Sequence, residues 1–461
     1  MNLPRPRSRR LPYPRWQMPQ PLAQPLPVPV RLILGLLALT ALGTVLLMLP
    51  GMAFGPHLTF EEALFTSVSA VTVTGLSVIA PGRDLTLLGQ TVLLLLMQLG
   101  GVGFMITAVV VLSLAGRRMG LMERLALRDS LGLLDLGAIR DLARRIMIVT
   151  LVIEAAGAVL LWLHWRSELP EGQAAFYAVF HAVAAFCNAG FDLFTGLPRY
   201  PLGLPNDTLT LFILGVLIFL GGLGFPVLYE LVNRRRQPHL SLHTRITLTV
   251  VVGLVVVGAI GLLLSEAGGP LTDEPGWRHV VIAVFQSVSA RTAGFMGTPN
   301  FDDLSPASQL LIMALMFIGS APASMGGGIT TGTFAVLGIA LWSYARGLPD
   351  VQVAGRQLTS VAVRRAAAVL SISLAVVVVA TWLILVTNKA PLNVALFEVV
   401  SAFATAGLSL SFTSELNRVG LGIIMLMMFW GRLGAITIVA AIAYRARLQL
   451  VSYPEEPVLL G

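Results

Sequence analysis

Long apolar runs alternate with short polar segments along almost the whole chain. Eight of these runs are long enough for a helix that crosses a bilayer, which needs about 20 residues. They cover residues 28–50, 85–115, 146–165, 208–232, 246–265, 307–343, 366–387 and 419–444. The run 307–343 is too long for one plain span, and glycines interrupt its middle. The pattern therefore predicts eight transmembrane helices.

A second class of apolar segment precedes the second run of each pair, at residues 60–72, 174–187, 279–290 and 392–404. Each is about half a bilayer long, which favours a re-entrant helix. In register they read FTSVSAVTVTG from Phe65, FHAVAAFCNAG from Phe180, FQSVSARTAG from Phe285 and FEVVSAFATAG from Phe397. The third copy is one residue shorter. A second glycine motif follows each copy, at Gly100, Gly221, Gly319 and Gly431.

Two motifs in the same order, four times over, indicate an internal repeat. The predicted fold class is an all-α polytopic membrane protein. It has four parallel span–pore-helix–span repeats, hence eight transmembrane helices and four re-entrant pore loops around a pseudo-fourfold pore. The repeats cover residues 28–115, 146–232, 245–343 and 364–447. Between and around them we expect a disordered cytoplasmic arm (1–27), a cytoplasmic amphipathic connection (116–145) and a C-terminal tail (448–461).

Composition agrees with a membrane protein, since 56% of the residues are hydrophobic and only 12% are charged. The net charge of +8 does not indicate nucleic-acid binding, because 23 of the 31 basic residues fall on one side of the predicted spans. The positive-inside rule places that side, with both termini, in the cytoplasm, so the glycine turns face outward. The six histidines and one cysteine show no metal-ligand spacing, and no nucleophile–base constellation indicates an enzyme.

Four equivalent glycine turns around one axis can pool their backbone carbonyl oxygens. Such a ring replaces the hydration shell of a monovalent cation. Glycine adopts the positive φ angles that turn carbonyls inward, and each half-helix directs its negative C-terminal end towards the axis. The repeat therefore predicts a cation pore, not an anion or sugar site.

The four turns, which end at Gly75, Gly190, Gly294 and Gly407, resemble the filters of the Trk/Ktr/HKT potassium transporter superfamily. The stretches SAVTVTG from Ser69 and ARTAGF from Ala290 look like those of KtrB-type subunits, the membrane subunits of bacterial Ktr systems. The resemblance covers nearly the whole chain after residue 27. It implies that potassium is bound by filter carbonyls of Val73, Thr74, Gly75, Asn188, Ala189, Gly190, Thr292, Ala293, Gly294, Thr405, Ala406 and Gly407.

The resemblance also implies a gate. Residues 319–332 resemble an intramembrane gating loop, with gating residues Gly319, Ser320, Ala321, Ser324, Gly326, Gly327 and Gly328. Arg432 resembles the pore arginine, and we expect it to hydrogen-bond this loop and repel cations until the loop moves. Arg291 is predicted to support the filter by bonding carbonyls of its turn. For Glu398, support through buried hydrogen bonds and attraction of cations are both open.

Two positions depart from the family pattern: Thr330 stands where a lysine is usual, and Ala435 where a proline is usual. By contrast, Gly75 favours potassium, because relatives that prefer sodium carry serine there. Transport would follow the membrane potential, and one glycine per turn predicts imperfect exclusion of sodium.

The expected function is potassium uptake across the bacterial cytoplasmic (inner) membrane. The resemblance implies a homodimer that works with a cytoplasmic nucleotide-binding regulatory ring (KtrA-like) and contacts lipid but no nucleic acid. No cofactor is expected in this chain; potassium is the transported ligand, and sodium is a candidate activator. Two alternatives stay open, a sodium-permeable transporter of the same fold and a secondary transporter of a small solute, which the parallel repeats disfavour.

Overall fold

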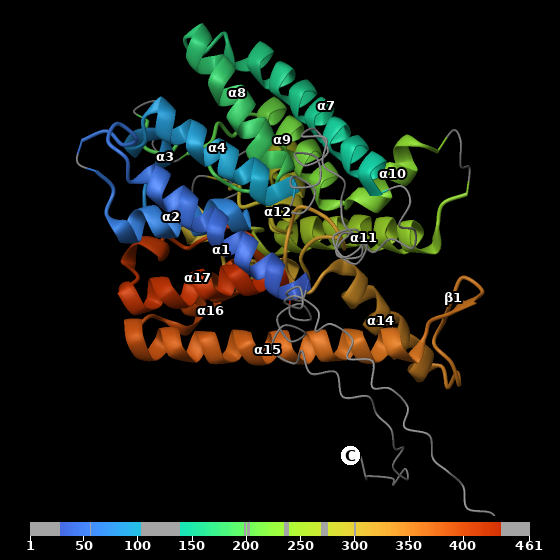
Figure 1. Ribbon diagram of the computed structural model, residues 1–461. Helices are drawn as coiled ribbons and strands as arrows, with labels where there is room; N and C mark the ends of the chain where they lie inside the picture. Colours follow the sequence, from blue (N-terminus) through green and yellow to red (C-terminus); the bar gives the residue numbers. More distant parts are fainter. Residues whose placement is uncertain are drawn as a thin grey trace, which may run out of the picture.

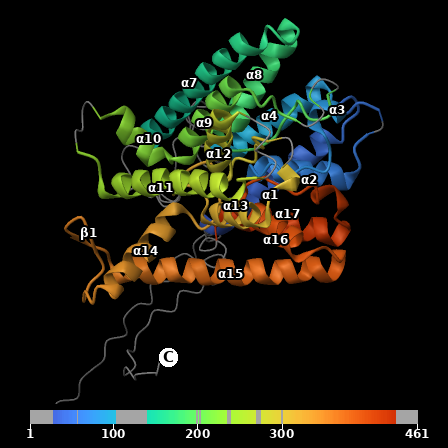
Figure 2. The ribbon, with the colours of Figure 1, turned by 180° about the vertical axis from the view of Figure 1, so that it is seen from behind.

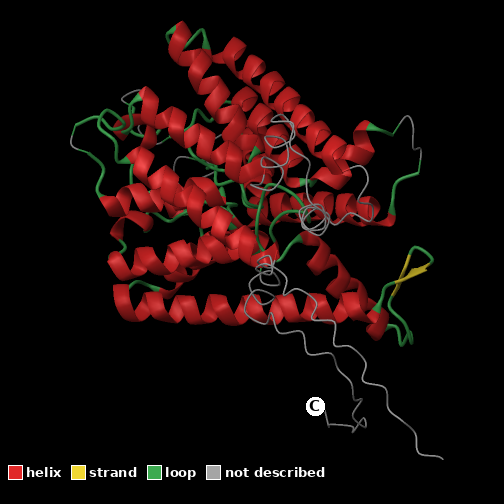
Figure 3. Ribbon diagram, in the orientation of Figure 1, coloured by secondary structure: helices red, strands yellow, loops and turns green. Residues whose placement is uncertain are grey.

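The computed structural model describes residues 28–55, 57–102, 139–197, 200, 203–234, 239–268, 275–298 and 301–434. Regular structure in these ranges is almost entirely helical (Figure 3), apart from a hairpin of β1 (Gln352–Val353) and β2 (Arg356–Gln357). The predictions for the arm 1–27, most of the connection 116–145, Ala435 and the tail 448–461 fall outside the described residues.

Each repeat begins with one long helix: α1 (Val28–Leu47), α7 (Ile139–Trp165), α11 (Leu242–Ser265) or α15 (Ser360–Asn388). All four contain an apolar window long enough to cross a membrane, of which only 28% to 33% is buried inside the protein. Large apolar side chains such as Leu163, Leu264 and Val378 are exposed on them. An apolar exposed face of this extent fits contact with lipid, so the predicted first spans are confirmed.

The half-length predictions are also confirmed. The second helix of each repeat is α2 (Phe60–Thr72), α8 (Glu171–Phe186), α12 (Gly276–Ser289) or α16 (Leu392–Ala404). With 13 to 16 residues, these helices are about 20 to 24 Å long and cannot cross a bilayer. The start of α2 is fixed by a capping box, in which Thr59 and Glu62 satisfy each other's backbone N–H groups.

The second spans of repeats 2, 3 and 4 break or end at a glycine, while the described residues of the second span of repeat 1 stop at Val102. These spans are α4 (Leu87–Val102), which follows the short α3 (Pro81–Asp84), then α9 (Thr208–Gly222) with α10 (Phe225–Val232), α13 (Pro306–Ile318) with α14 (Thr331–Ala345), and α17 (Arg418–Leu433). Short 3-10 helices, η2 (Phe301–Asp303) and η3 (Thr413–Glu415), precede α13 and α17.

The span predicted over 208–232 consists of two helices, since α9 and α10 are bent by 105°. Gly224 has a φ of 85°, and Pro226, which cannot donate a helical hydrogen bond, stands at the start of α10. The predicted interruption of 307–343 is confirmed, since residues 319–330 separate α13 from α14.

The four repeats form a closed ring. Each re-entrant helix packs against a span of its own repeat and also against the second span of the repeat before it: α8 on α4, α12 on α9, α16 on α13 and α2 on α17. The last of these contacts joins repeat 4 to repeat 1. Figure 1 shows α7–α9 at the top and α15–α17 at the bottom, and Figure 2 brings α11 to α13 to the front. The re-entrant helices therefore surround one central axis.

Candidate functional site

Each re-entrant helix ends in a short loop, and we call residues 73–75, 188–190, 292–294 and 405–407 the glycine loops. In three of them the middle backbone N–H donates to the carbonyl five residues earlier, at 2.7–2.8 Å. The first residues of these three loops, Val73, Asn188 and Thr405, have φ between 51° and 58°. This is a Schellman helix end formed without glycine at the left-handed position, which costs about 1 to 2 kcal/mol per residue. Strain of this kind is typical of functional sites.

The third glycine loop differs because it is one residue shorter. Ala293 N–H donates to the carbonyl of Ser289, four residues earlier, at 2.8 Å. Thr292 has a φ of 95°, compared with less than 60° at the other three first positions. The missing residue is therefore absorbed at the helix end, and Gly294 still reaches the same place as its counterparts.

The four glycines meet around the axis. Gly75, Gly190, Gly294 and Gly407 have φ angles of 90°, 66°, 76° and 80°, which favour glycine. A Cβ atom on Gly75 would lie 2.4 Å from the carbonyl oxygen of Ala189 in the next loop. The same relation continues around the circuit, at 2.7 Å from Gly190 to Ala293, 2.7 Å from Gly294 to Ala406 and 2.1 Å from Gly407 back to Thr74. We call this closed circuit of glycines and middle carbonyls the glycine ring.

On one side of the glycine ring lies a cavity of about 380 Å³. All four ring glycines line it, together with the irregular segments that follow them in the chain, which we call the strands beyond the ring glycines. Asp192 lines it too, and burial alone would raise the pKa of this carboxyl. Hydrogen bonds from His181, Thr195 and the backbone N–H of Phe194 outweigh burial and leave its pKa below the ordinary value. Asp192 is therefore a carboxylate that these donors hold in place beside the cavity.

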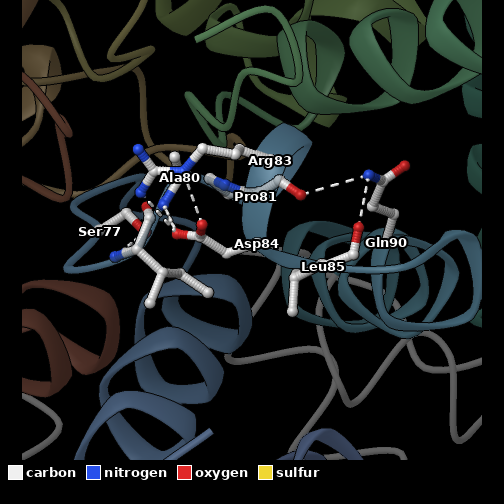
Figure 4. Close-up of polar contacts among 8 residues, drawn as sticks. Ser77, Ala80, Pro81, Arg83, Asp84, Leu85 and Gln90 are labelled. Atoms are coloured by element: carbon white, nitrogen blue, oxygen red, sulfur yellow. Dashed lines mark hydrogen bonds and ion pairs between the residues drawn. The ribbon is translucent and has the colours of Figure 1, made fainter. Parts of the chain in front are cut away.

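Hydrogen bonds link the residues of the cavity wall in repeat 1, as Figure 4 shows. Asp84 accepts hydrogen bonds from the backbone N–H of Ala80 and from Arg83 Nε, both at 2.8 Å. Gln90 of α4 donates to the carbonyls of Pro81, at 3.2 Å, and Leu85, at 2.9 Å. Ala80 and Pro81 line the cavity, so these bonds fix its edge.

The loop 319–330 lies against the residues that begin the glycine loops, away from the cavity. Ser320 Oγ is 2.6 Å from Thr292 Oγ1 and donates to the carbonyl of Arg291 at 2.9 Å. A Cβ atom on Gly326 would lie 1.9 Å from Thr292 Oγ1, and one on Gly327 would lie 2.8 Å from Thr405 Oγ1. These small residues therefore let the loop reach the underside of the glycine ring.

The same loop is hydrogen-bonded to the C-terminal end of α9. The N–H groups of Ala321 and Met325 donate to the carbonyls of Gly222, at 3.1 Å, and Gly221, at 3.3 Å. The Ser324 hydroxyl is buried and has no partner among the described residues. Loop 319–330, which forms no helix or sheet, is thus held by backbone bonds to a neighbouring repeat and by the side-chain bonds of Ser320.

Arg432, near the end of α17, bridges three repeats. Its guanidinium donates to the carbonyl of Met325 in loop 319–330 and to the carbonyls of Gly100 and Gly101, the latter at 3.0 Å. No carboxylate among the described residues lies within ion-pair distance of it. The predicted hydrogen bond to the loop is confirmed, and within the described ranges the partners of the charge are carbonyl dipoles.

The structure places the two predicted support residues differently. Arg291 is buried, and its nearest acceptor is the carbonyl of Gly319, at 3.5 Å, so it faces loop 319–330 and not the carbonyls of its own turn. The prediction for its partners is corrected accordingly. Glu398 accepts hydrogen bonds from Ser409 Oγ, at 2.7 Å, and Thr413 Oγ1, at 2.5 Å. Its buried hydrogen-bonding role is therefore the one that the geometry favours.

The second glycine motif was recognised in the sequence, but its role was not. A Cβ atom on Gly221 would lie 1.9 Å from the carbonyl oxygen of Phe186, while one on Gly222 would meet nothing closer than 3.4 Å. The same contact recurs from Gly100 to the carbonyl of Val71 and from Gly431 to the carbonyl of Phe403. In repeats 1, 2 and 4 these glycines let the second span touch the end of its re-entrant helix, whereas Gly319 of repeat 3 packs against Gly327 of loop 319–330.

We expect Gly221→Ala to destabilise the protein by about 3 kcal/mol, because backbone on both sides of the contact must move. Gly222→Ala is the matched control and should be tolerated, since its nearest neighbour is at ordinary contact distance. Membrane yield and thermal midpoint in detergent measure the difference. Equal midpoints for the two variants would contradict this contact.

The comparisons with known proteins agree with this geometry. The family model of the cation transport protein TrkH matches residues 32–447. The Ktr system potassium uptake protein B of Vibrio alginolyticus is 37% identical over 440 residues, which cover 93% of this chain and 94% of that protein. The potassium/sodium uptake protein NtpJ of Enterococcus hirae is 32% identical over 442 residues, 94% of this chain and 97% of that protein.

A crystal structure of the potassium transporter TrkH from Vibrio parahaemolyticus has a TM-score of 0.71 to this structure at 21% identity. The match covers 90% of this chain and 84% of that chain, which shows a common fold. The chain therefore belongs to the TrkH family of cation transport proteins, a family of transporters and not of enzymes.

Proposed function

We propose that this chain is the ion-translocating subunit of a Ktr-type potassium uptake system and that the glycine ring is its filter. The observation that carries the proposal is the closed circuit from Gly75 through Gly190 and Gly294 to Gly407, in which each glycine faces a carbonyl of the next loop. Only backbone can occupy that ring. Carbonyl oxygens in such a ring replace the hydration shell of potassium. The name of the Vibrio alginolyticus relative supports potassium as the ion.

Electrostatics support a cation path through the ring. Four re-entrant helices direct their C-terminal, negative ends towards it, and the carboxylate of Asp192, paired with His181, lies beside the outer cavity. An inside-negative potential contributes about 2.3 kcal/mol per charge per 100 mV, enough to accumulate potassium without a second energy source.

We place the cavity side outside a bacterial cytoplasmic membrane and the termini in the cytoplasm. The arginines at the predicted outer end are largely offset: Arg83 pairs with Asp84 and Arg418 with Glu61, each at 2.8 Å. Basic residues are more numerous at the other end, near α10, α14 and the start of α15. This asymmetry is the one that the positive-inside rule describes.

Loop 319–330 and Arg432 form the gate in this proposal. The loop lies under the ring, and the half-buried guanidinium of Arg432 repels cations there. A cytoplasmic nucleotide-binding ring (KtrA-like) moves the loop, and two copies of this chain form a homodimer, with sodium as a candidate activator. A sodium-permeable pore is the second candidate, because the printed name of the Enterococcus hirae relative includes both ions.

The ratio of rubidium to sodium uptake, compared between wild type and the Gly75→Ser variant, tests the filter assignment. In potassium-starved cells that lack their own uptake systems, wild type should take up rubidium in preference to sodium by about tenfold. At a φ of 90°, a serine Cβ would press against the carbonyl of Ala189 at 2.4 Å, so the variant should lower this preference at least about fivefold.

Gly253→Ser in α11 is the matched control, since a Cβ there meets nothing within 4 Å. Uptake no greater than in cells without the protein would overturn the transport proposal. An unchanged rubidium-to-sodium ratio in Gly75→Ser would overturn the filter assignment alone.

A further inference from the structure

One position of each re-entrant helix carries a buried polar side chain. It directly follows the phenylalanine with which the aligned segments begin, and its four occupants are Thr66, His181, Gln286 and Glu398. Their exposed fractions are 0%, 0%, 3% and 0%. A polar group buried this deeply destabilises the fold unless it is hydrogen-bonded, so its partners show what it does.

In repeat 2 the partner lies on the strand that leaves Gly190. His181 Nε2 is 2.9 Å from Asp192 Oδ1, and the backbone N–H of Leu193 is 3.3 Å from the same nitrogen. His181 Nδ1 is 2.7 Å from the carbonyl of Tyr177, which fixes the ring to its own helix. Aromatic rings pack around the imidazole, with that of Phe194 at 5.0 Å between centroids. His181 therefore joins the re-entrant helix to residues two and three positions beyond the ring glycine.

Repeats 3 and 4 make the same connection with different chemistry. Gln286 Oε1 accepts a hydrogen bond from the backbone N–H of Gly297, three residues beyond Gly294, at 2.9 Å. Glu398 accepts from Ser409 and Thr413, two and six residues beyond Gly407. Three side chains at one helix position thus reach the same part of three loops.

Repeat 1 lacks this connection. Thr66 is too short to reach the strand beyond Gly75, and its hydroxyl has no partner among the described residues. That strand is fixed from the other side, by Asp84 and Gln90 (Figure 4). Every strand beyond a ring glycine is therefore held. Among the described residues, this helix position holds it in repeats 2 to 4, whereas in repeat 1 the re-entrant helix holds Gly75 itself, whose N–H donates to Ser69 Oγ at 3.0 Å.

We propose that His181, Gln286 and Glu398 are positioning residues that set the ion selectivity of the pore. The inference rests on the proposed function, because it concerns the spacing of the same carbonyl ring. A glycine has no side chain with which to pack, so its place depends on its own backbone bonds and on the bonds of the residues on either side. Loss of one connection widens one quarter of the ring, and the preference for potassium over sodium falls.

The test is the rubidium-to-sodium uptake ratio, which does not depend on the amount of protein in the membrane. We expect His181→Ala and Glu398→Ala to lower the ratio about fivefold. His181→Gln introduces the residue that repeat 3 uses at the same position, and it should keep the ratio within about twofold, as should Glu398→Gln. Thr66→Val is the matched control. The Thr66 hydroxyl has no hydrogen-bond partner among the described residues, so this variant should leave the ratio unchanged.

Thr413→Val and Asp192→Asn keep the experiment informative where an alanine variant fails to reach the membrane. Both alter a partner on the strand, keep the size of the side chain and should also lower the ratio. If the variants reduce only the amount of protein and leave the ratio at the wild-type value, the positioning role is overturned. If Gly75→Ser shifts the ratio and these variants do not, only the positioning role fails; if neither shifts it, the filter assignment fails.

Discussion

Replacement of Arg432 by alanine is expected to raise rubidium uptake into proteoliposomes that contain this chain alone by about tenfold or more. The guanidinium lies under the glycine ring and bonds the carbonyls of Met325, Gly100 and Gly101, with no carboxylate among the described residues to offset its charge. Two like charges 4 Å apart repel by about 4 kcal/mol at an effective dielectric constant near 20. Its removal therefore lowers the barrier and releases loop 319–330 at the same time.

Arg418→Ala is the matched control, because it removes one arginine from the same helix. Arg418 is exposed at the outer end of α17, where it pairs with Glu61. Its loss should leave uptake unchanged, since exposed ion pairs contribute little. Uptake by Arg432→Ala that equals or falls below wild type, at equal reconstituted protein, would contradict a gating role for Arg432.

Gly407→Ala should reduce rubidium uptake to the background of empty vesicles. The residue has a φ of 80°, and a Cβ there would lie 2.1 Å from the carbonyl oxygen of Thr74. The left-handed conformation alone costs alanine about 1 to 2 kcal/mol, and relief of the clash displaces a carbonyl from the ring. The change falls where the fourth loop meets the first, so it opens the circuit at its closing contact.

Gly422→Ala in α17 offers the comparison, because a Cβ on this helical glycine meets nothing within 4 Å. Both variants should be recovered from membranes, and their elution from a sizing column separates loss of conduction from loss of folding. If folded Gly407→Ala retains half of the wild-type uptake, the closing contact of the ring is not needed for conduction.

The re-entrant helices were predictable because their limits are encoded locally. The predicted segments 60–72 and 392–404 coincide with α2 and α16, whose starts are marked by the capping pair of Thr59 and Glu62 and by Pro391. The bend between α9 and α10 was missed because hydropathy stays high across it. Gly224 and Pro226 were the available signal, and they mark a break that composition alone cannot reveal.

Contacts between repeats were less predictable. The sequence shows four equivalent turns, but the order in which they meet follows from packing of one repeat on the next. Arg291 was expected to bond its own turn, and only the folded position of Gly319 shows its actual acceptor. The residues that the four aligned segments share do not reveal Asp192 and His181, because His181 stands at a position where the segments differ and Asp192 lies beyond them.

The four sectors of the ring belong to one polypeptide, so the residues at equivalent positions need not be identical. In a tetramer of identical chains, an arginine at the position of Arg432 would be present four times, and four guanidinium groups would crowd one passage. Here the position equivalent to Arg432 holds Gly101, Gly222 and Ser320 in the other three sectors. A single codon can therefore alter one quarter of the passage, and its properties can be adjusted in small steps that a symmetric assembly does not allow.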